Sequence, residues 1–376
     1  MMLALSFILL CYIFFLLKFY RGYTVLVKEN KDIEIQQIES QKTTFSIIIP
    51  YRNEVEYLPT LLKSLSNLNY PISLFEIIMV NDNSEDASQS LVQQCDLENL
   101  LNIQNKRSTA SPKKDAITTA IDLAKNEWIV TTDADCIVPK NWLQVLDNCI
   151  QKTNPSMVCG PVLYASDKSF LQDFQQLDGI SLQGITMGSF GNQKPLLSNG
   201  AHLAYKKTTF MALDGFQGNE HLASGDDIFM LEKVKAQDPK GLHYLFSKNA
   251  IVQTHPETTW SNLVSQRVRW TSKTTQTKNK TSIWMGMLVF LTNLTAISLP
   301  IISLFFPFYW GMTLLFWSIK ISADIIFIKQ LQPFFTTNIS TLRILQIGVL
   351  YPFISCWVVL QSISGSYAWK GRRHKK

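Results

Sequence analysis

The amino-acid sequence predicts an α/β domain with a doubly wound sheet, flanked by apolar segments that are long enough to cross a membrane. Two observations predict this arrangement. Short apolar runs alternate with segments of helical periodicity between residues 45 and 132, and the excess of apolar residues is concentrated at the two ends of the 376-residue chain. We therefore expect one domain of mixed polarity between membrane anchors.

Four apolar runs are expected to form strands that are buried on both faces, as in a parallel sheet. Segments of helical spacing separate them: apolar residues from Val55 to Leu68, a short stretch that ends near Cys95, and the residues from Ile117 to Ala124. This alternation is typical of doubly wound α/β sheets. The runs are "FSIIIP" (45–50), "FEIIMV" (75–80), "LLNIQ" (100–104) and "EWIVTT" (127–132).

The two ends of the chain have the composition of membrane spans. Residues 3–17 are apolar and uncharged, and neither a basic region before them nor a small-residue cleavage site after them indicates a cleaved signal peptide. Residues 282–319 contain no charged side chain and are long enough for most of a helical hairpin, and a further span is expected over about 344–364. Between these segments, Lys320 and Asp324 are four residues apart and are expected to pair.

The basic residues after the first span predict the orientation of the domain. Lys18, Arg21 and Lys28 place it in the cytoplasm by the positive-inside rule. Three C-terminal spans would then put the basic tail outside, so either one segment is re-entrant or the charge signal is overridden. The predicted parts are an anchor (1–22), the cytoplasmic domain (43–255), an interfacial segment (256–281), about three spans (282–368) and a basic tail (369–376).

Composition excludes several classes of function. The six cysteines form no CxxC pair and no zinc spacing, so we expect reduced thiols. Much of the net charge of +6 lies in the closing "KGRRHKK", which favours anionic lipid headgroups as its partner. No basic patch interleaved with aromatic residues occurs in the middle of the chain, so we expect no nucleic acid partner.

Polar residues follow three of the predicted strands. Arg52 follows the first, Asp82 follows the second, and Asp133 and Asp135 follow the fourth. Ligands of open α/β sheets bind beyond the carboxyl ends of the strands. We therefore expect these side chains to converge on one ligand crevice, although they are far apart in the sequence.

Asp133 and Asp135 are candidate ligands of a divalent cation. Residues i and i+2 of an extended segment point the same way, so both carboxylates would face one ligand. A hard cation such as Mg²⁺ or Mn²⁺ prefers oxygen ligands and would offset the repulsion between the two charges. The alternative for "TTDADC" (131–136) is a solvated turn with a helix cap.

Six motifs in order resemble the inverting family 2 glycosyltransferases, which have the GT-A fold. The resemblance covers roughly residues 43–275 and extends to the catalytic domains of ceramide glucosyltransferase and of polysaccharide synthases. The sequence departs from the family pattern at Asn81, Asn83 and Pro112, and Asp226 replaces a Glu of an acidic pair. The motifs are "SIIIPYRNE", "VNDNSED", "DADC", "NGAHLAYKKTTFMALDGF" (199–216), "SGDD" (224–227) and "QRVRW" (266–270).

The resemblance implies a binding site for a nucleotide-sugar donor. Asp82 would accept a hydrogen bond from the nucleobase, expected to be uracil; its alternative role is the N-cap of the following helix. Asp133 would meet the ribose side of the donor, and Asp135 with Asp133 would hold Mg²⁺ or Mn²⁺ against the diphosphate. The other residues expected at the donor are Pro50, Arg52, Glu54, Lys113 and Arg269, with a solvated strand end left open for Arg52 and a surface position for Lys113.

The resemblance also implies the catalytic and acceptor residues. Asp227 matches the general base of an inverting transfer, Asp226 is the neighbouring candidate, and one of the two would orient the other. The alternative is a cap for the helix that follows them. Gln266 and Trp270 would lie at the acceptor, although the segment around them also suits an interfacial amphipathic helix.

The sequence thus predicts a membrane glycosyltransferase of the bacterial inner membrane. It would transfer a hexosyl or N-acetylhexosaminyl group, with inversion, from a nucleotide-sugar, expected to be UDP-linked, to a lipid or glycan of the cell envelope. The alternatives are a processive polysaccharide synthase and a non-catalytic, membrane-anchored sensor of sugar nucleotides. A nucleotidyltransferase is disfavoured, because "PYRNEVEY" lacks a basic or glycine-rich triphosphate loop.

Overall fold

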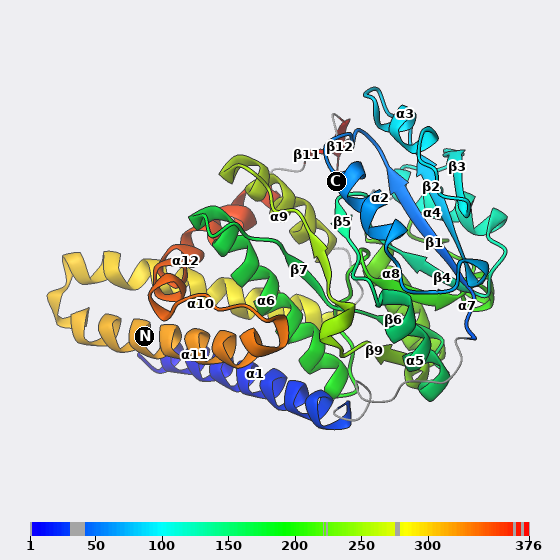
Figure 1. Ribbon diagram of the computed structural model, residues 1–376. Helices are drawn as coiled ribbons and strands as arrows, with labels where there is room; N and C mark the ends of the chain where they lie inside the picture. The colour runs from blue at the N-terminus through cyan, green and yellow to red at the C-terminus, as the bar shows by residue number, and fades with distance from the viewer. Residues whose placement is uncertain are drawn as a thin grey trace. The chain divides into compact units, whose positions relative to one another are not determined.

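The fold is described from a computed structural model (Figure 1). It describes residues 2–30, 42–220, 222, 225–274, 279–363, 366–369 and 372–375. Contacts within the chain divide it into two compact units. The helical unit comprises Met1–Thr24, Ser166–Asn192 and Pro256–Lys376, and the sheet unit comprises Val25–Ala165 and Gln193–His255.

The sheet unit is built on a seven-stranded mixed sheet with the strand order β3-β2-β1-β4-β8-β6-β9. The first four strands run parallel, β8 runs antiparallel to both of its neighbours, and β9 runs parallel to β6. The four strands predicted from sequence are confirmed, as is the doubly wound α/β class. The strands are β1 (Phe45–Tyr51), β2 (Phe75–Asn81), β3 (Leu100–Gln104), β4 (Trp128–Thr131), β6 (Met157–Cys159), β8 (Leu203–Lys206) and β9 (Leu242–Tyr244).

The apolar runs form strands because helices cover the sheet on both faces. Ile47 and Ile49 of β1 belong to a core cluster with residues of α2 and α5. Ile48 points to the opposite face, and α4 packs against β1 and β2. All three isoleucines are fully buried, which explains a continuous rather than an alternating apolar pattern. The helices of this unit are α2 (Leu58–Ser66), α3 (Ser88–Gln93), α4 (Pro112–Leu123), α5 (Trp142–Thr153), α7 (Lys207–Ala212) and α8 (Asp226–Gln237).

A second, three-stranded sheet includes the short strand that follows the predicted acidic motif in the sequence. Its order is β5-β10-β7, with β10 antiparallel to β5 and parallel to β7. The strands are β5 (Cys136–Ile137), β7 (Val162–Tyr164) and β10 (Val252–Thr254). The main-chain N–H of His255, after β10, donates to the carbonyl of Asp135 at 3.3 Å. This small sheet therefore fixes the backbone that carries Asp135.

Among the described residues, four helices are long and apolar enough to cross a membrane: Leu5–Glu29, Lys280–Phe305, Pro307–Phe335 and Thr341–Ile363. All four belong to the helical unit, except that the first continues past Thr24 into the sheet unit. The first runs beyond the predicted boundary at residue 22, and residues 366–369 and 372–375 pair as a hairpin where a basic tail was expected. The elements are α1 (Met2–Glu29), α6 (Phe170–Gly191), α9 (Trp260–Thr274), α10 (Lys280–Phe305), α11 (Trp310–Phe335), α12 (Thr341–Ile363), β11 (Ser366–Trp369) and β12 (Arg372–Lys375).

Helix α6 interrupts the sheet unit in sequence but belongs to the helical unit, which the sequence analysis did not predict. Its backbone lies in direct contact with the backbone of α1. A Cβ added to Gly188 would lie 2.2 Å from the carbonyl oxygen of Phe19, and one added to Gly191 would lie 1.9 Å from that of Gly22. Only glycine permits this approach, so these positions fix how α1 and α6 pack.

Candidate active site

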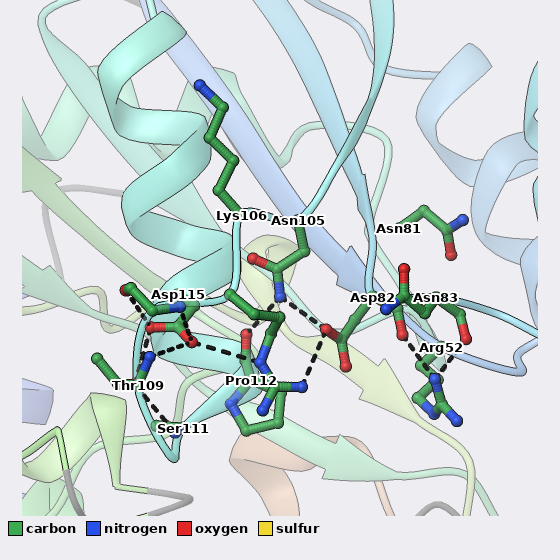
Figure 2. Close-up of polar contacts among 12 residues, drawn as sticks. Arg52, Asn81, Asp82, Asn83, Asn105, Lys106, Thr109, Ser111, Pro112 and Asp115 are labelled. Atoms are coloured by element: carbon green, nitrogen blue, oxygen red, sulfur yellow. Dashed lines mark hydrogen bonds and ion pairs between the residues drawn. The ribbon is translucent and has the colours of Figure 1, made fainter.

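The loops after β1 and β2 are bound to each other at the carboxyl edge of the sheet (Figure 2). Arg52 donates from Nη1 to the main-chain oxygens of Asp82, at 2.8 Å, and of Asn83, and its Nη2 contacts Glu85 at 2.7 Å. Asn53 accepts the main-chain N–H of Glu85 at 2.8 Å. The guanidinium of Arg52, expected at the donor, is thus engaged in holding the loop that carries Asp82.

The three departures from the family pattern in this region fit the local backbone. Asn81 accepts from the N–H of Ser84 and donates to Gln89, and an aspartate carboxylate at this position could only accept. Asn83 has φ = 56°, a left-handed conformation that Asn tolerates and that glycine usually supplies. Pro112 is the first residue of α4, where its missing N–H costs nothing.

Asp82 lies at the meeting point of three strand ends. Its side chain is 7% exposed, and Oδ1 accepts hydrogen bonds from Asn105 Nδ2 at 2.7 Å and from Arg107 Nη1 at 3.4 Å (Figure 2). Asn105 follows β3 and also donates to the carbonyl of Pro112. Asp82 does not cap α3, which begins at Ser88 after Ala87, so that alternative is wrong.

The loop from Asn105 to Ser111 is organised by the buried carboxylate of Asp115. This carboxylate accepts from the main-chain N–H and the hydroxyl of both Ser108 and Thr109, at 2.8 to 3.1 Å. It also contacts Arg107 Nε at 3.4 Å. Sequence reasoning missed these residues; the signal available was that polar residues follow β3 as they follow its neighbours.

Lys113 joins the two acidic motifs of the sheet unit. Its ammonium lies 2.6 Å from Asp133 Oδ1, after β4, and 3.3 Å from Asp226 Oδ2, at the start of α8. Burial by itself would lower the pKa of Lys113, but the neighbouring carboxylates, Asp133 first among them, raise it above its ordinary value. A Cβ added to Gly200 would lie 2.8 Å from Asp226 Oδ2 and 2.9 Å from Lys113 Nζ, so this glycine leaves room for the pair.

Asp226 and Asp227 have different surroundings. Asp226 is 5% exposed and faces Lys113, whereas Asp227 is partly exposed and accepts the N–H of Ile228 at 2.9 Å. Gly225, in a left-handed conformation, precedes them at the N-cap of α8, and no side chain caps the helix there. Both charges are favoured by the helix N-terminus. Ser224 of the predicted motif lies outside the described residues.

Asp133 and Asp135 do not lie on an extended segment, so that expectation is wrong. Strand β4 ends at Thr131, and the N–H of Cys136 donates to the carbonyl of Asp133 at 3.1 Å, which closes a turn. Ala134 is buried inside this turn, and both acidic side chains are partly exposed. The turn therefore presents the two carboxylates at the end of the strand.

The residues present fit a divalent cation only in part. Carboxylate oxygens suit Mg²⁺ or Mn²⁺, but no group of three or more His, Cys, Asp or Glu side chains among the described residues is arranged to hold a metal. Mg²⁺ is commonly bound by one or two carboxylates together with substrate phosphates and water. Asp133 and Asp135 suit such an incomplete site, and Asp133 also contacts the ammonium of Lys113 at 2.6 Å.

The predicted acceptor residues belong to the helical unit. In α9, Gln266 donates to Glu257 at 3.0 Å, whereas Arg269 and Trp270 are partly exposed. Arg267, which the sequence analysis did not single out, is buried, contacts Asp178 of α6 at 2.7 Å and stacks on Trp270 at 4.2 Å. The other predicted site residues belong to the sheet unit.

The remaining donor candidates have ordinary positions in the sheet unit. Pro50 is partly exposed in β1, and Glu54 is buried, with its main-chain N–H donating to Ser88 at 2.8 Å.

His202 is buried between Trp142, which donates to Nε2 at 2.8 Å, and the carbonyl of Pro161 at 3.1 Å from Nδ1. Burial lowers the pKa of His202 to about 4, so it is a neutral structural group.

Comparisons with known proteins relate this chain to one family. Residues 46–212 match the family model described as glycosyl transferase family 2. Glycosyltransferase AglE from Haloferax volcanii is 22% identical over 269 residues, which cover 70% of this chain and 81% of the relative. Beta-monoglucosyldiacylglycerol synthase from Nostoc sp. is 26% identical over 110 residues, 29% of this chain and 24% of the relative.

A solved structure shares the fold. The mannosyltransferase PcManGT from Pyrobaculum calidifontis, in complex with GDP-Man and Mn²⁺, has a TM-score of 0.52 and 14% sequence identity. The match covers 96% of this chain and 99% of that chain. Residues 46–212 therefore match the glycosyl transferase family 2 model, the fold is GT-A-like, and the chain is a glycosyltransferase.

Proposed function

We propose that the chain transfers a sugar, with inversion, from a nucleoside diphosphate sugar, which we expect to be UDP-linked, to a lipid or glycan acceptor at the membrane. One observation carries this proposal: the ammonium of Lys113 contacts both Asp133, at 2.6 Å, and Asp226, at 3.3 Å. Motifs separated by about ninety residues thus meet at the edge of the sheet where α/β proteins bind their ligands.

The contrast between the two acidic residues of α8 supports Asp227 as the general base. Asp226 is buried and paired with Lys113 at 3.3 Å, so its carboxylate is less accessible to an acceptor hydroxyl. Asp227, which is partly exposed, would take the proton of the acceptor hydroxyl while the hydroxyl oxygen forms its bond to the anomeric carbon. The bond between that carbon and the nucleoside diphosphate breaks in the same step. Asp226 would orient Lys113.

The donor would lie along the carboxyl ends of β1, β2 and β4. Asp82 would read the nucleobase, Arg52 would hold the loop that carries Asp82, and Lys113 would bind an oxygen of the diphosphate. Asp135 and Asp133 would hold Mg²⁺ or Mn²⁺, which would offset the charge that develops on the leaving diphosphate. In the helical unit, Arg269 is proposed at the donor, and Gln266 and Trp270 at the acceptor.

The apolar helices support an acceptor at the membrane surface. Four helices in the described part of the chain are long and apolar enough to span a membrane, and the Nostoc relative is named as a synthase of a glucosylated diacylglycerol. Few polar side chains occur in the spans, so we propose transfer of one or a few sugars rather than polymer export, which needs a polar channel. The proposed location is the bacterial inner membrane with the sheet unit in the cytoplasm.

A screen of nucleotide-sugars tests the proposal. Purified full-length protein in lipid nanodiscs would receive UDP- and GDP-sugars with Mn²⁺ or with a chelator, in the presence and absence of a membrane lipid extract. Product mass would identify the donor and the acceptor. The expected result is a metal-dependent product that carries one or a few sugars.

Two results would count against the proposal. Neither transfer nor hydrolysis of any donor with Mn²⁺ would favour the non-catalytic sensor, and a ladder of high-molecular-weight product would favour the processive synthase. Asp122→Asn, on the exposed side of α4, is a matched control for charge loss away from the site. Its activity is expected to equal that of the wild type.

A further inference from the structure

The side chain of Arg107 connects two acidic residues in the loop after β3. Its Nη1 lies 3.4 Å from Asp82 Oδ1, and its Nε lies 3.4 Å from Asp115 Oδ2. The side chain of Arg107 is 33% exposed, whereas those of Asp82 and Asp115 are 7% and 2% exposed. A guanidinium therefore lies on the solvent side of the carboxylate that is proposed to read the nucleobase.

The loop does not need Arg107 to satisfy its buried carboxylates. Asp115 already accepts four hydrogen bonds from Ser108 and Thr109, at 2.8 to 3.1 Å. Asp82 already accepts a shorter bond, 2.7 Å, from Asn105. The two contacts of Arg107 are long and use two of the five N–H groups of a guanidinium. A purely structural role therefore does not account for the other N–H groups of this guanidinium.

We propose that Arg107 is a specificity-determining residue, which together with Asp82 selects a nucleobase that has a ring N–H beside a carbonyl group. This inference rests on the proposed function, in which the sheet unit binds a nucleoside diphosphate sugar. A carboxylate only accepts hydrogen bonds, and a guanidinium only donates them. The pair therefore presents an acceptor next to a donor, in a fixed order, to the edge of the base.

Among the four RNA nucleobases, uracil and guanine match this order. Uracil presents N3–H beside O4, and guanine presents N1–H beside O6, so Asp82 would accept from the ring N–H and Arg107 would donate to the carbonyl. Cytosine and adenine present a ring nitrogen lone pair beside an amino group, which reverses both partners. The carboxylate would then face a lone pair, and a buried polar group that loses its hydrogen-bond partner weakens binding.

Asp115 anchors Arg107 and is thus a positioning residue. It contacts Nε of the guanidinium and leaves Nη1 at the other end in contact with Asp82. The planar fork of arginine matters in this arrangement, since lysine carries its charge on a single nitrogen. A lysine at this position would keep the attraction to Asp82 but would not span both acidic residues.

Equilibrium binding of four nucleotides tests the proposal. UDP, GDP, CDP and ADP share the diphosphate and differ in the base, and each would be titrated with Mn²⁺ against full-length protein in detergent. We expect UDP or GDP to bind at least ~30-fold more tightly than CDP and ADP. The comparison of UDP with GDP shows whether the base is a pyrimidine or a purine.

Variants of two neighbouring residues supply the decisive comparison. Arg107→Met is expected to weaken binding of the preferred nucleotide by ~10- to 100-fold and to leave CDP and ADP unchanged, because only the matched base uses the guanidinium. Arg107→Lys is expected to fall between the wild type and Arg107→Met. Lys106→Met, at an exposed position whose side chain points away from Asp82 in Figure 2, is the matched control and is expected to change none of the four affinities.

Three outcomes would overturn the inference. Equal weakening of all four nucleotides by Arg107→Met would mean that Arg107 only holds the loop, and unchanged affinities would mean that it does not face the base. In both cases the proposed function survives, since the wild type still binds a nucleotide. If the wild type binds none of the four, the proposed function fails and this inference fails with it. Thermal unfolding of each variant confirms that the fold is retained.

Discussion

The two units use charged side chains in different ways. In the sheet unit, Lys113 faces two carboxylates at once, and its contact with Asp133 is partly exposed. In the helical unit, Arg267 pairs with Asp178 at 2.7 Å, with both side chains at most 10% exposed. A ligand can replace one of two competing partners at small cost, but a buried pair cannot be opened without leaving a bare charge.

The same contrast holds for packing. Strand β4 and helix α5 of the sheet unit bury the large side chains of Trp128 and Trp142, whereas α1 and α6 meet at glycines with their backbones in contact. Lys320 and Asp324 of α11 pair at 2.8 Å, as their spacing predicts, and Tyr12 of α1 donates to Asp324 at 2.6 Å. We therefore expect substitutions at the sheet edge to change activity and substitutions in the helical unit to change folding.

The largest effect is expected from Asp227→Asn. The amide keeps the shape of the side chain but cannot accept the proton of the acceptor hydroxyl, so turnover should fall by ~100-fold or more while donor binding is retained. Initial rates at saturating donor, together with the affinity for UDP, measure both quantities. If Asp226→Asn is inactive and Asp227→Asn remains active, the base is Asp226 and the proposed assignment is off by one residue.

Next in size is the loss of metal-dependent donor binding in Asp135→Ala. A methyl group cannot replace a hard oxygen ligand, so Mn²⁺ should no longer increase the affinity for UDP. Calorimetric titration of UDP with Mn²⁺ and with a chelator measures the difference. The fold should be retained, because the structural contact of Asp135 is made by its main chain. Its carbonyl accepts the N–H of His255, and the substitution leaves this hydrogen bond intact. Unchanged Mn²⁺ dependence would remove Asp135 from the metal site.

Much of the sheet unit could be predicted because burial on both faces leaves continuous apolar runs in the sequence. Helix α6 could not, because its buried residues include Gln175 and Gln183, which break the apolar periodicity. Their partners become apparent only in three dimensions: Gln175 donates to the carbonyl of Glu257 and accepts the N–H of the same residue. A buried polar residue satisfied by a distant partner gives no local signal.

The residues of the candidate site also differ in whether the sequence could predict them. Asp82, Asp133 and Asp226 could be predicted because acidic residues follow a strand or begin a helix in recognisable motifs. Asn105 and Arg107 could not, since the loop "NKRSTAS" (105–111) reads as an ordinary polar connection. The turn at Asp133 was mistaken for an extended segment because "EWIVTT" continues in sequence past the point where β4 ends.

An intermediate effect, on folding alone, is expected from Gly188→Ala. The added methyl would lie 2.2 Å from the carbonyl oxygen of Phe19, so α1 and α6 must separate, at a cost of ~1 to 3 kcal/mol. Gly286→Ala in α10 is the matched control, because nothing lies within 4 Å of an added Cβ there. Thermal unfolding in detergent should show a lower Tm for the first variant only. Equal Tm values would contradict backbone contact between α1 and α6.

The smallest effect is expected from His202→Gln. This variant tests whether the sheet unit, like the helical unit, contains buried polar pairs that cannot be charged without loss of stability. Glutamine can accept from Trp142 and donate to the carbonyl of Pro161 as the neutral imidazole does, so stability at pH 7.5 should change little. Burial lowers the pKa of His202 to about 4, below the ordinary value of ~6.5. The folded wild type therefore binds fewer protons than the unfolded chain between these values, and its stability falls as the pH falls through that window.

The variant has no imidazole to titrate, so this part of the pH dependence should disappear. Between pH 6.5 and 5 the wild type should lose about 1.5 kcal/mol more than His202→Gln, because the slope approaches its limit of 1.36 kcal/mol for each unit of pH only well below pH 6.5. Thermal unfolding across this range, above the pH at which most carboxylates titrate, measures the difference in slope. Parallel pH profiles would mean that His202 becomes protonated without unfolding, and that the sheet unit tolerates charge at a buried polar pair away from its ligand edge.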